Sequence, residues 1–193
     1  MNVSTEPSEA PQSRPDRRNV ILDAAGAVLL RYGYRKASVD EVAREAGVSR
    51  QGVYLHFPTK DELFSAAIVR LLAATISSTS AALDAPGSLE DRLLAAFAAM
   101  AGGELTDRLD EILAAAKRLT GRDGRELEGE IVAVFTAALE RTAPESHWRR
   151  RGDSAEAVAR VLYATSAGMK HLAPTTPDYL DEMRRTIGLI CSA

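Results

Sequence analysis

Residues 38–64 read SVDEVAREAGVSRQGVYLHFPTKDELF, and this stretch decides the fold. Ser38 and Glu41 have the spacing of a capping box, in which the serine hydroxyl accepts from a helix N–H and the glutamate reaches back to the serine N–H. Gly47 stands where a left-handed residue ends a helix, and Ser49 caps the next one. The pattern predicts two short helices joined by a tight turn. This is the helix-turn-helix arrangement, whose second helix can enter the major groove of DNA.

The rest of the chain is also helical in pattern. Apolar residues recur at intervals of three and four, and no segment alternates as a strand would. Asp153 is a candidate cap, and Pro177 suits the first position of the last helix. The sequence therefore predicts an all-α protein of about nine helices, over residues 16–33, 38–46, 49–57, 59–83, 88–101, 104–120, 125–142, 153–172 and 176–190, with a loop over 143–152.

The second helix of the motif has two faces when its residues are plotted at 100° each. The face expected to point outward carries Arg50, Gln51, Tyr54 and Leu55. The face expected to pack on the preceding helices carries Gly52, Val53, His56 and Phe57. His56 is thus expected to be a core histidine. Glycine costs about 1 kcal/mol in a helix relative to alanine, and we expect the missing side chain of Gly52 to allow a close helix contact that offsets this cost.

Charge is unevenly distributed along the chain. The net charge is −3, but residues 14–60 hold nine Lys/Arg and five Asp/Glu, a net +4 that leaves −7 for the rest. A basic segment on an acidic body favours a polyanionic partner, although ordinary fluctuation also produces an excess of this size.

Composition argues against several classes of protein. Cys191 is the only cysteine and the three histidines lie far apart, so we expect no disulfide, metal site, cofactor or catalytic residues, and no enzyme. No run approaches the roughly 18 uncharged apolar residues of a membrane span. Residues 1–14 are polar and proline-rich, which predicts a disordered tail rather than a secretory signal. A cytoplasmic protein is expected.

The motif also resembles a known family. Residues 38–64 are similar to the DNA-binding domain of the TetR family of bacterial transcriptional repressors, whose pattern is roughly T-x-x-x-I-A-x-x-A-G-V-S-x-x-x-L-Y-x-[HY]-F-x-x-K-x-x-L. The matching residues are Ser38, Val42, Ala43, Ala46, Gly47, Val48, Ser49, Val53, Tyr54, His56, Phe57, Lys60 and Leu63. Close similarity covers residues 16–64. Gly52 stands where the family usually has Thr or Ala. Leu55 stands where a polar residue is frequent, and its apolar side chain suggests a contact with a thymine methyl or no base contact.

The resemblance implies a helix-turn-helix DNA-binding domain over residues 15–63, followed by a larger helical regulatory and dimerisation domain over 64–193. It also implies a sequence-specific transcriptional regulator, in the first place a repressor released from a palindromic operator in double-stranded DNA by a small-molecule effector. Three alternatives to a repressor stay open. They are an activator, a helical protein–protein interaction or scaffold protein without specific DNA binding, and an enzyme.

Residue roles follow from the chemistry and the resemblance together. Arg50 and Gln51 are candidates for base reading, because Arg pairs bidentately with guanine and Gln with adenine; the alternative is that both lie along phosphates. Tyr54 and Lys60 are expected to contact phosphates, Lys60 with help from the positive end of its helix. The predicted DNA-contacting residues are Lys36, Ser38, Ser49, Arg50, Gln51, Tyr54 and Lys60. For Ser38 and Ser49, helix capping is an equally good reason to be present.

The last two helices are expected to pair with those of a second subunit, forming a homodimer. The residues that suit such a contact are Leu162, Ala164, Ala167, Gly168, Met169, Leu180, Met183, Ile187 and Ile190, although the same stripes suit a monomer core. An effector pocket is implied by the resemblance only. Its candidate residues, which also suit a plain core, are Phe97, Met100, Leu113, Phe135, Trp148, Tyr163 and Met169. Few charges fall on the apolar faces, so a small, largely apolar effector is expected.

Overall fold

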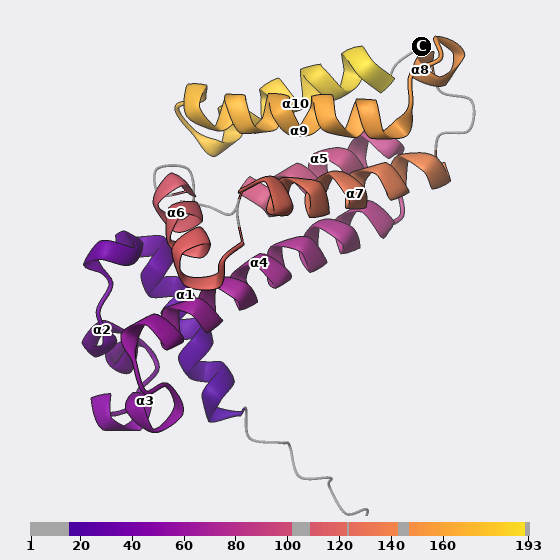
Figure 1. Ribbon diagram of the computed structural model, residues 1–193. Coiled ribbons are helices and arrows are strands. Elements are labelled where there is room, and N and C mark those ends of the chain that lie inside the picture. Colours follow the sequence, from indigo (N-terminus) through magenta and orange to yellow (C-terminus); the bar gives the residue numbers. More distant parts are fainter. Residues whose placement is uncertain (1–15, 102–108, 123, 143–146, 192–193) are drawn as a thin grey trace, which may run out of the picture.

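The computed structural model describes residues 16–101, 109–122, 124–142 and 147–191. Within these ranges the chain is helical without any strand, so the all-α prediction is confirmed (Figure 1). The helices are α1 (Arg17–Lys36), α2 (Val39–Glu45), α3 (Arg50–His56), α4 (Lys60–Asp84), α5 (Leu89–Ala101), α6 (Leu109–Thr120), α7 (Gly124–Thr142), α8 (His147–Arg150), α9 (Ala155–Leu172) and α10 (Thr176–Cys191). The tail expected over residues 1–14 and the first helical residues expected from 104 lie outside the described residues.

The ends of α2 and α3 form as the sequence predicts. The Ser38 hydroxyl accepts from the Glu41 N–H at 3.2 Å, and the Glu41 carboxylate accepts from the Ser38 N–H at 2.9 Å, so the capping box is present. The Ser49 hydroxyl accepts from the Gly52 N–H at 3.0 Å and starts α3. Between the two helices, Gly47 has a φ of 64°, the left-handed conformation expected there. These bonds fix the turn that aims α3.

Three details of the later helices differ from the predictions. Helix α8 lies inside the segment 143–152, which was expected to be a loop. The sequence did not predict this helix because four residues are too few to show a helical period. Ser154, rather than Asp153, caps α9. Thr175 caps α10 through the Asp178 N–H at 3.3 Å, which makes Pro177 the second helical residue instead of the first.

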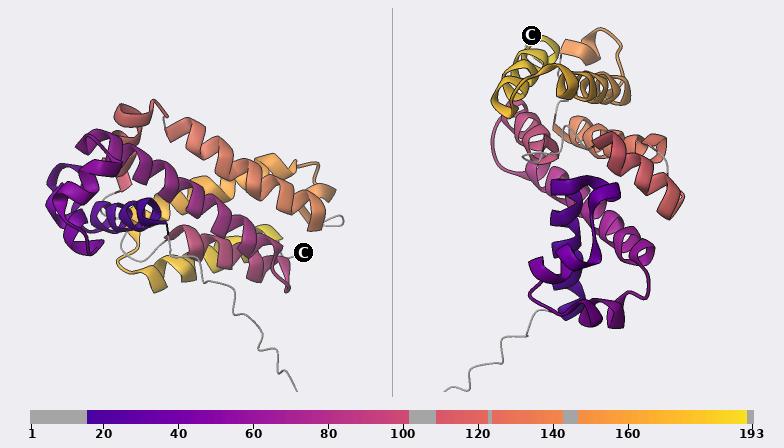
Figure 2. Two further views of the ribbon diagram at one scale, coloured as in Figure 1. Left: turned by 90° about the horizontal axis from the view of Figure 1, so that it is seen from below. Right: turned by 90° about the vertical axis from the view of Figure 1, so that its left-hand side faces the viewer.

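Within the described part of the chain, buried side chains gather in two clusters. The amino-terminal cluster joins α1–α4 to α6, and its fully covered members include Ile21, Leu29, Val42, Val53, Leu63, Phe64, Ile68 and Ala116. The carboxy-terminal cluster joins the far end of α4 to α5 and α7–α10, and it includes Leu83, Leu93, Phe97, Phe135, Leu139, Leu162, Met183 and Ile187. Figures 1 and 2 show α2 and α3 at one end of the molecule and α9 and α10 at the other. By length and composition alone α4 qualifies as a membrane span, but it packs against α1, α5, α6 and α7.

Gly33 connects α1 to α6. Its φ of 71° and ψ of 166° lie outside the helical region and interrupt α1 where the sequence predicts the helix to end, although helical residues continue to Lys36. The Glu111 carboxylate of α6 fills the space beside Gly33 and accepts from the Arg35 N–H at 2.8 Å. A β-carbon at position 33 would lie 2.7 Å from the Glu111 Cδ atom. Helix α6 therefore attaches to the end of α1 through a polar contact that needs a glycine.

Gly33→Ala is expected to lower the free energy of unfolding by about 1–3 kcal/mol, because this backbone conformation is essentially restricted to glycine. Gly26→Ala is the matched control. Gly26 lies in the helical part of the same helix, and its β-carbon would meet no atom within 4 Å apart from the local backbone of its own helix. That substitution is expected to stabilise by about 0.4–1 kcal/mol. Urea denaturation of both variants checks the pair, and equal effects of the two substitutions would contradict the assignment.

Candidate nucleic-acid interface

Two buried side chains seat α3 on the amino-terminal cluster. Val53 is fully buried and Phe57 is 3% exposed, and both point into this cluster. The guanidinium of Arg18, from α1, lies 4.9 Å from the centre of the Phe57 ring and covers its outer side. Residues on opposite faces of a helix point in opposite directions, so the face of α3 opposite Val53 is left to solvent.

The exposed face carries the side chains that the helical plot places there. Arg50 and Gln51 are exposed, Tyr54 is 36% exposed and Leu55 is 80% exposed. We call these four residues the α3 ridge. His56 is exposed as well, so its prediction as a core histidine was wrong. His56 is the last residue of α3, and the helical plot assumes that neighbouring helices cover a face along its whole length.

The reason expected for Gly52 was also wrong. A β-carbon there would meet the Ser49 hydroxyl at 3.3 Å and the Val48 β-carbon at 3.7 Å, and no atom of another helix lies within 4 Å. Gly52 therefore does not bring α3 closer to a neighbouring helix. It leaves room for the capping hydroxyl of Ser49, which accepts the Gly52 N–H.

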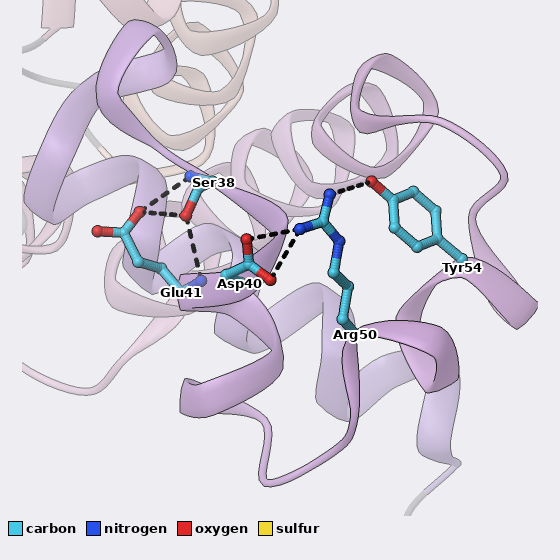
Figure 3. Close-up of polar contacts among 5 residues, drawn as sticks. All are labelled: Ser38, Asp40, Glu41, Arg50 and Tyr54. Atoms are coloured by element: carbon cyan, nitrogen blue, oxygen red, sulfur yellow. Dashed lines mark hydrogen bonds and ion pairs between the residues drawn. The ribbon is translucent and has the colours of Figure 1, made fainter.

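Arg50 is held by side chains from two helices (Figure 3). Its Nη1 donates to both carboxylate oxygens of Asp40, at 2.9 and 3.2 Å, and its Nη2 donates to the Tyr54 hydroxyl at 3.5 Å. The hydrogen bond with Tyr54 raises the pKa of Arg50, and the nearby negative charge of Asp40 raises it further. The guanidinium thus stays charged and points along the exposed side of the motif. Sequence reasoning missed Asp40, because no periodicity relates a residue of α2 to one of α3.

A second polar cluster lies where α4 begins, and it joins three helices. The Tyr34 hydroxyl of α1 donates to Asp61 of α4, and Arg118 of α6 donates to the same carboxylate at 3.3 Å. The hydrogen bond from Tyr34 holds the pKa of Asp61 below its ordinary value, and Arg118 lowers it further. Arg118 also lies 4.7 Å from the centre of the Tyr34 ring. None of these contacts follows from local sequence pattern.

Lys60 belongs to this cluster and is only half-buried. Its Nζ donates to the Tyr34 carbonyl at 3.3 Å and lies 4.9 Å from the centre of the Tyr34 ring. An ammonium has three N–H donors, so a phosphate contact by Lys60 is compatible with this bond and stays a prediction.

The other predicted DNA-contacting residues lie at helix ends. Ser38 is half-buried and Ser49 exposed, and the hydroxyl of each serves as a cap. Lys36 is exposed at the end of α1. Their contacts with a nucleic acid also stay predictions.

Comparison with known proteins shows which family has this motif. The family model for bacterial regulatory proteins of the tetR family matches residues 21–67, the segment that contains α2, α3 and the beginning of α4. The matched segment is a TetR-family helix-turn-helix. The recognition made from residues 38–64 is therefore confirmed.

Relatives of this chain include both activators and repressors. The HTH-type transcriptional activator FasR of Mycolicibacterium smegmatis is 38% identical over 86 residues, which cover 45% of this chain and 39% of FasR. The chain thus matches about two fifths of the length of that relative. The HTH-type transcriptional repressor BepR of Brucella suis is 28% identical over 168 residues, 79% of this chain and 78% of BepR. A transcriptional regulator of Rhodococcus sp. RHA1 has a similar solved structure, with a TM-score of 0.64, 25% identity, and coverage of 90% of this chain and 95% of that one.

The residues predicted for an effector pocket fall in different places. Phe97, Met100, Phe135 and Trp148 are buried in the carboxy-terminal cluster, and Tyr163 and Met169 pack against it. Leu113 is half-buried on α6, whose Ala115 and Ala116 belong to the amino-terminal cluster. The rings of Phe97 and Phe135 stack on each other with their centres 4.7 Å apart. Trp148 also lines a small surface pocket of about 180 Å³ beside Val161 and Leu189.

One charge does lie among these apolar side chains. Lys170 of α9 is half-buried, and its Nζ donates to the Met100 carbonyl at 3.2 Å. Burial lowers the pKa of Lys170 below its ordinary value. The apolar character expected of this region therefore has an exception beside Met100.

Apolar residues of α9 and α10 divide between the core and the surface. Leu162, Met183 and Ile187 are at most 1% exposed, so the chain itself covers them and they do not face a second subunit, contrary to the expectation. The outward residues include Val161 (53% exposed), Ala164, Gly168 and Leu172 (74%) on α9, and Leu189 (86%) on α10. We call these five residues the α9–α10 face.

Proposed function

We propose that this TetR-family protein is a sequence-specific transcriptional regulator that binds a palindromic operator as a homodimer and represses transcription until a small effector releases it. The observation that carries the proposal is the α3 ridge: Arg50 and Gln51 project from the second helix of a capped helix-turn-helix, with no described element covering them. Both side chains have the donors that read base edges in the major groove.

Two arguments support a dimer: reading a palindrome takes two copies of α3, and the α9–α10 face offers a contact surface. A single two-turn helix reads few base pairs, whereas two copies about 34 Å apart read both halves of a palindrome. The α9–α10 face offers the surface, because Val161, Ala164, Gly168 and Leu172 form one stripe of α9 at intervals of three or four residues. Small residues within an exposed apolar stripe suit close packing against a symmetry-related helix. The face lies at the opposite end from α3, so pairing through it leaves both α3 ridges free (Figures 1 and 2).

Release by an effector is a shift between two arrangements of the dimer. A ligand that binds better to the arrangement in which the two α3 helices no longer fit successive major grooves lowers operator affinity. The stacked Phe97 and Phe135 and the buried Trp148 support a compact, largely apolar ligand. Thermal-shift measurements with apolar and polyanionic metabolites test this part, and stabilisation by polyanions alone would overturn it.

Selection from a pool of duplexes with about 30 randomised base pairs tests the central claim. The wild-type protein is expected to enrich a sequence with two inverted half-sites and to retard it in a gel. Transcription in vitro from a promoter that overlaps this sequence is expected to fall when the protein is added. A rise would indicate activation, and a pool that stays random would overturn the proposal.

Arg50→Ala and Lys60→Ala are expected to weaken binding in different ways. Loss of a bidentate Arg–guanine pair lowers discrimination at one base pair of each half-site by about 1–3 kcal/mol. Loss of a phosphate contact leaves discrimination unchanged, weakens binding to every sequence, and reduces the salt slope by about one unit. Gel-shift titrations across salt concentrations measure both quantities. Because Lys60 also binds the Tyr34 carbonyl, a circular dichroism melt of Lys60→Ala is needed to show that its fold is intact.

A further inference from the structure

We propose that Asp40 is a positioning residue that determines which base Arg50 reads. The inference rests on the proposed function and deepens it, because it concerns how the α3 ridge selects its sequence. Asp40 lies in the first turn of α2, outside the helix that enters the groove, and its carboxylate is bound to the guanidinium of Arg50.

The geometry of the pair leaves one reading edge of Arg50 available. Asp40 takes Nη1 alone, with both of its oxygens, and Tyr54 is at hydrogen-bond distance from Nη2. A guanidinium has a second bidentate edge formed by Nε and Nη2. That edge can donate to the O6 and N7 atoms of a guanine while Asp40 keeps Nη1. The pair therefore orients Arg50 for a base without occupying all of its donors.

The negative charge of Asp40 also makes phosphate binding by Arg50 less favourable. An unrestrained arginine at a DNA surface turns readily to a phosphate, which gives affinity without sequence information. A carboxylate beside it repels phosphates and competes for the guanidinium, so phosphate binding becomes less favourable than guanine binding. Because Arg50 is ordered before DNA arrives, less conformational entropy is lost when it binds the base.

The pair has little to contribute to folding. The side chains of Arg50 and Asp40 are 58% and 56% exposed, and exposed ion pairs usually add little stability. Removing the pair should therefore change base preference without changing the thermal unfolding of the protein. A merely structural role for Asp40 would give the opposite result.

Asp40→Asn is the test, and Glu45→Gln is its matched control. Glu45 lies on the same helix and forms a comparable exposed ion pair, with Arg31 at 3.2 Å, that does not involve α3. Each variant removes one negative charge and one ion pair at nearly constant side-chain shape. Wild-type protein, both variants, Arg50→Ala and the Asp40→Asn/Arg50→Ala double variant are each used to select from the same randomised duplex pool. The base pair read by Arg50 is the one at which Arg50→Ala loses its preference.

Asp40→Asn is expected to lower guanine preference at that base pair about tenfold, with the other positions unchanged. Glu45→Gln is expected to keep the wild-type preference, and both variants should bind unrelated duplexes more tightly to a similar extent. Their melting temperatures are expected to stay within about 2 °C of the wild type. In the Arg50→Ala background, Asp40→Asn is expected to add nothing.

Two results would overturn the inference while leaving the proposed function intact. One is a wild-type selection profile for Asp40→Asn. The other is a loss of preference at base pairs other than the one that Arg50 reads, also in the Arg50→Ala background, which would mean that Asp40 acts through another group. A wild-type protein that selects no sequence at all would instead overturn the proposed function.

Discussion

Ala164→Glu is expected to turn the dimer into a monomer and to weaken operator binding by about 100-fold or more, since a buried carboxylate without a partner costs several kcal/mol. Ala164 lies near the middle of the α9 stripe, and the twofold axis would bring the two glutamates close together. Glutamate is nearly as favourable as alanine in a helix, and position 164 is exposed in the single chain, so the fold should be kept.

Ala73→Glu is the control for this substitution. Ala73 is exposed on α4 and lines an apolar groove that also involves Leu22 and Leu30 of α1. Light scattering at micromolar concentration and a gel-shift titration are expected to show a dimer for Ala73→Glu and a monomer for Ala164→Glu. If Ala73→Glu alone split the dimer, the subunits would be meeting through α1 and α4 instead.

Phe64→Ala is expected to cost about 3–5 kcal/mol of unfolding free energy. Phe64 is fully buried at the beginning of α4, with the Tyr34 ring edge-on at 5.7 Å and the Lys60 ammonium 5.7 Å from its ring centre. Its removal opens a cavity under the cluster that holds α1, α4 and α6 together. Operator binding is expected to be lost at temperatures where the wild-type protein still binds.

Leu55→Ala provides the contrast for Phe64→Ala. Leu55 is also a large apolar residue of the amino-terminal helices, but its side chain is 80% exposed on the α3 ridge. Its replacement is expected to change stability by no more than about 0.5 kcal/mol. Urea denaturation measures both variants. A loss for Phe64→Ala as small as that for Leu55→Ala would mean that the amino-terminal cluster is not what supports α3.

Local chemistry made the helix-turn-helix predictable. The side chains of Ser38 and Glu41 each accept the other residue's backbone N–H within one turn, and Gly47 adopts a conformation that few other residues tolerate. Both signals can therefore be read from the local sequence. The exposed ridge was predictable as well, because 100° per residue separates Arg50 and Tyr54 from the buried Val53. The same calculation failed at His56, the last residue of the helix, which is exposed.

Contacts between helices were not predictable in the same way. Asp40 meets Arg50, and Glu111 meets the end of α1, through tertiary packing that no periodicity encodes. Periodicity also shows that α9 has a broad apolar stripe without showing which part its own chain covers. Leu162 is fully buried and the adjacent Val161 is 53% exposed, a division that depends on where α5, α7 and α10 lie.

The continuity of α4 has a mechanical consequence. The helix runs through 25 residues from Lys60 to Asp84, a rod of about 37 Å at 1.5 Å per residue. Tilting such a rod by about 5° around its Asp84 end displaces the Lys60 end by about 3 Å, close to the 3.4 Å rise between stacked base pairs. In the proposed complex with DNA, a small adjustment among the residues around Leu83 would therefore be enough to carry α3 out of register with the groove by nearly one base pair.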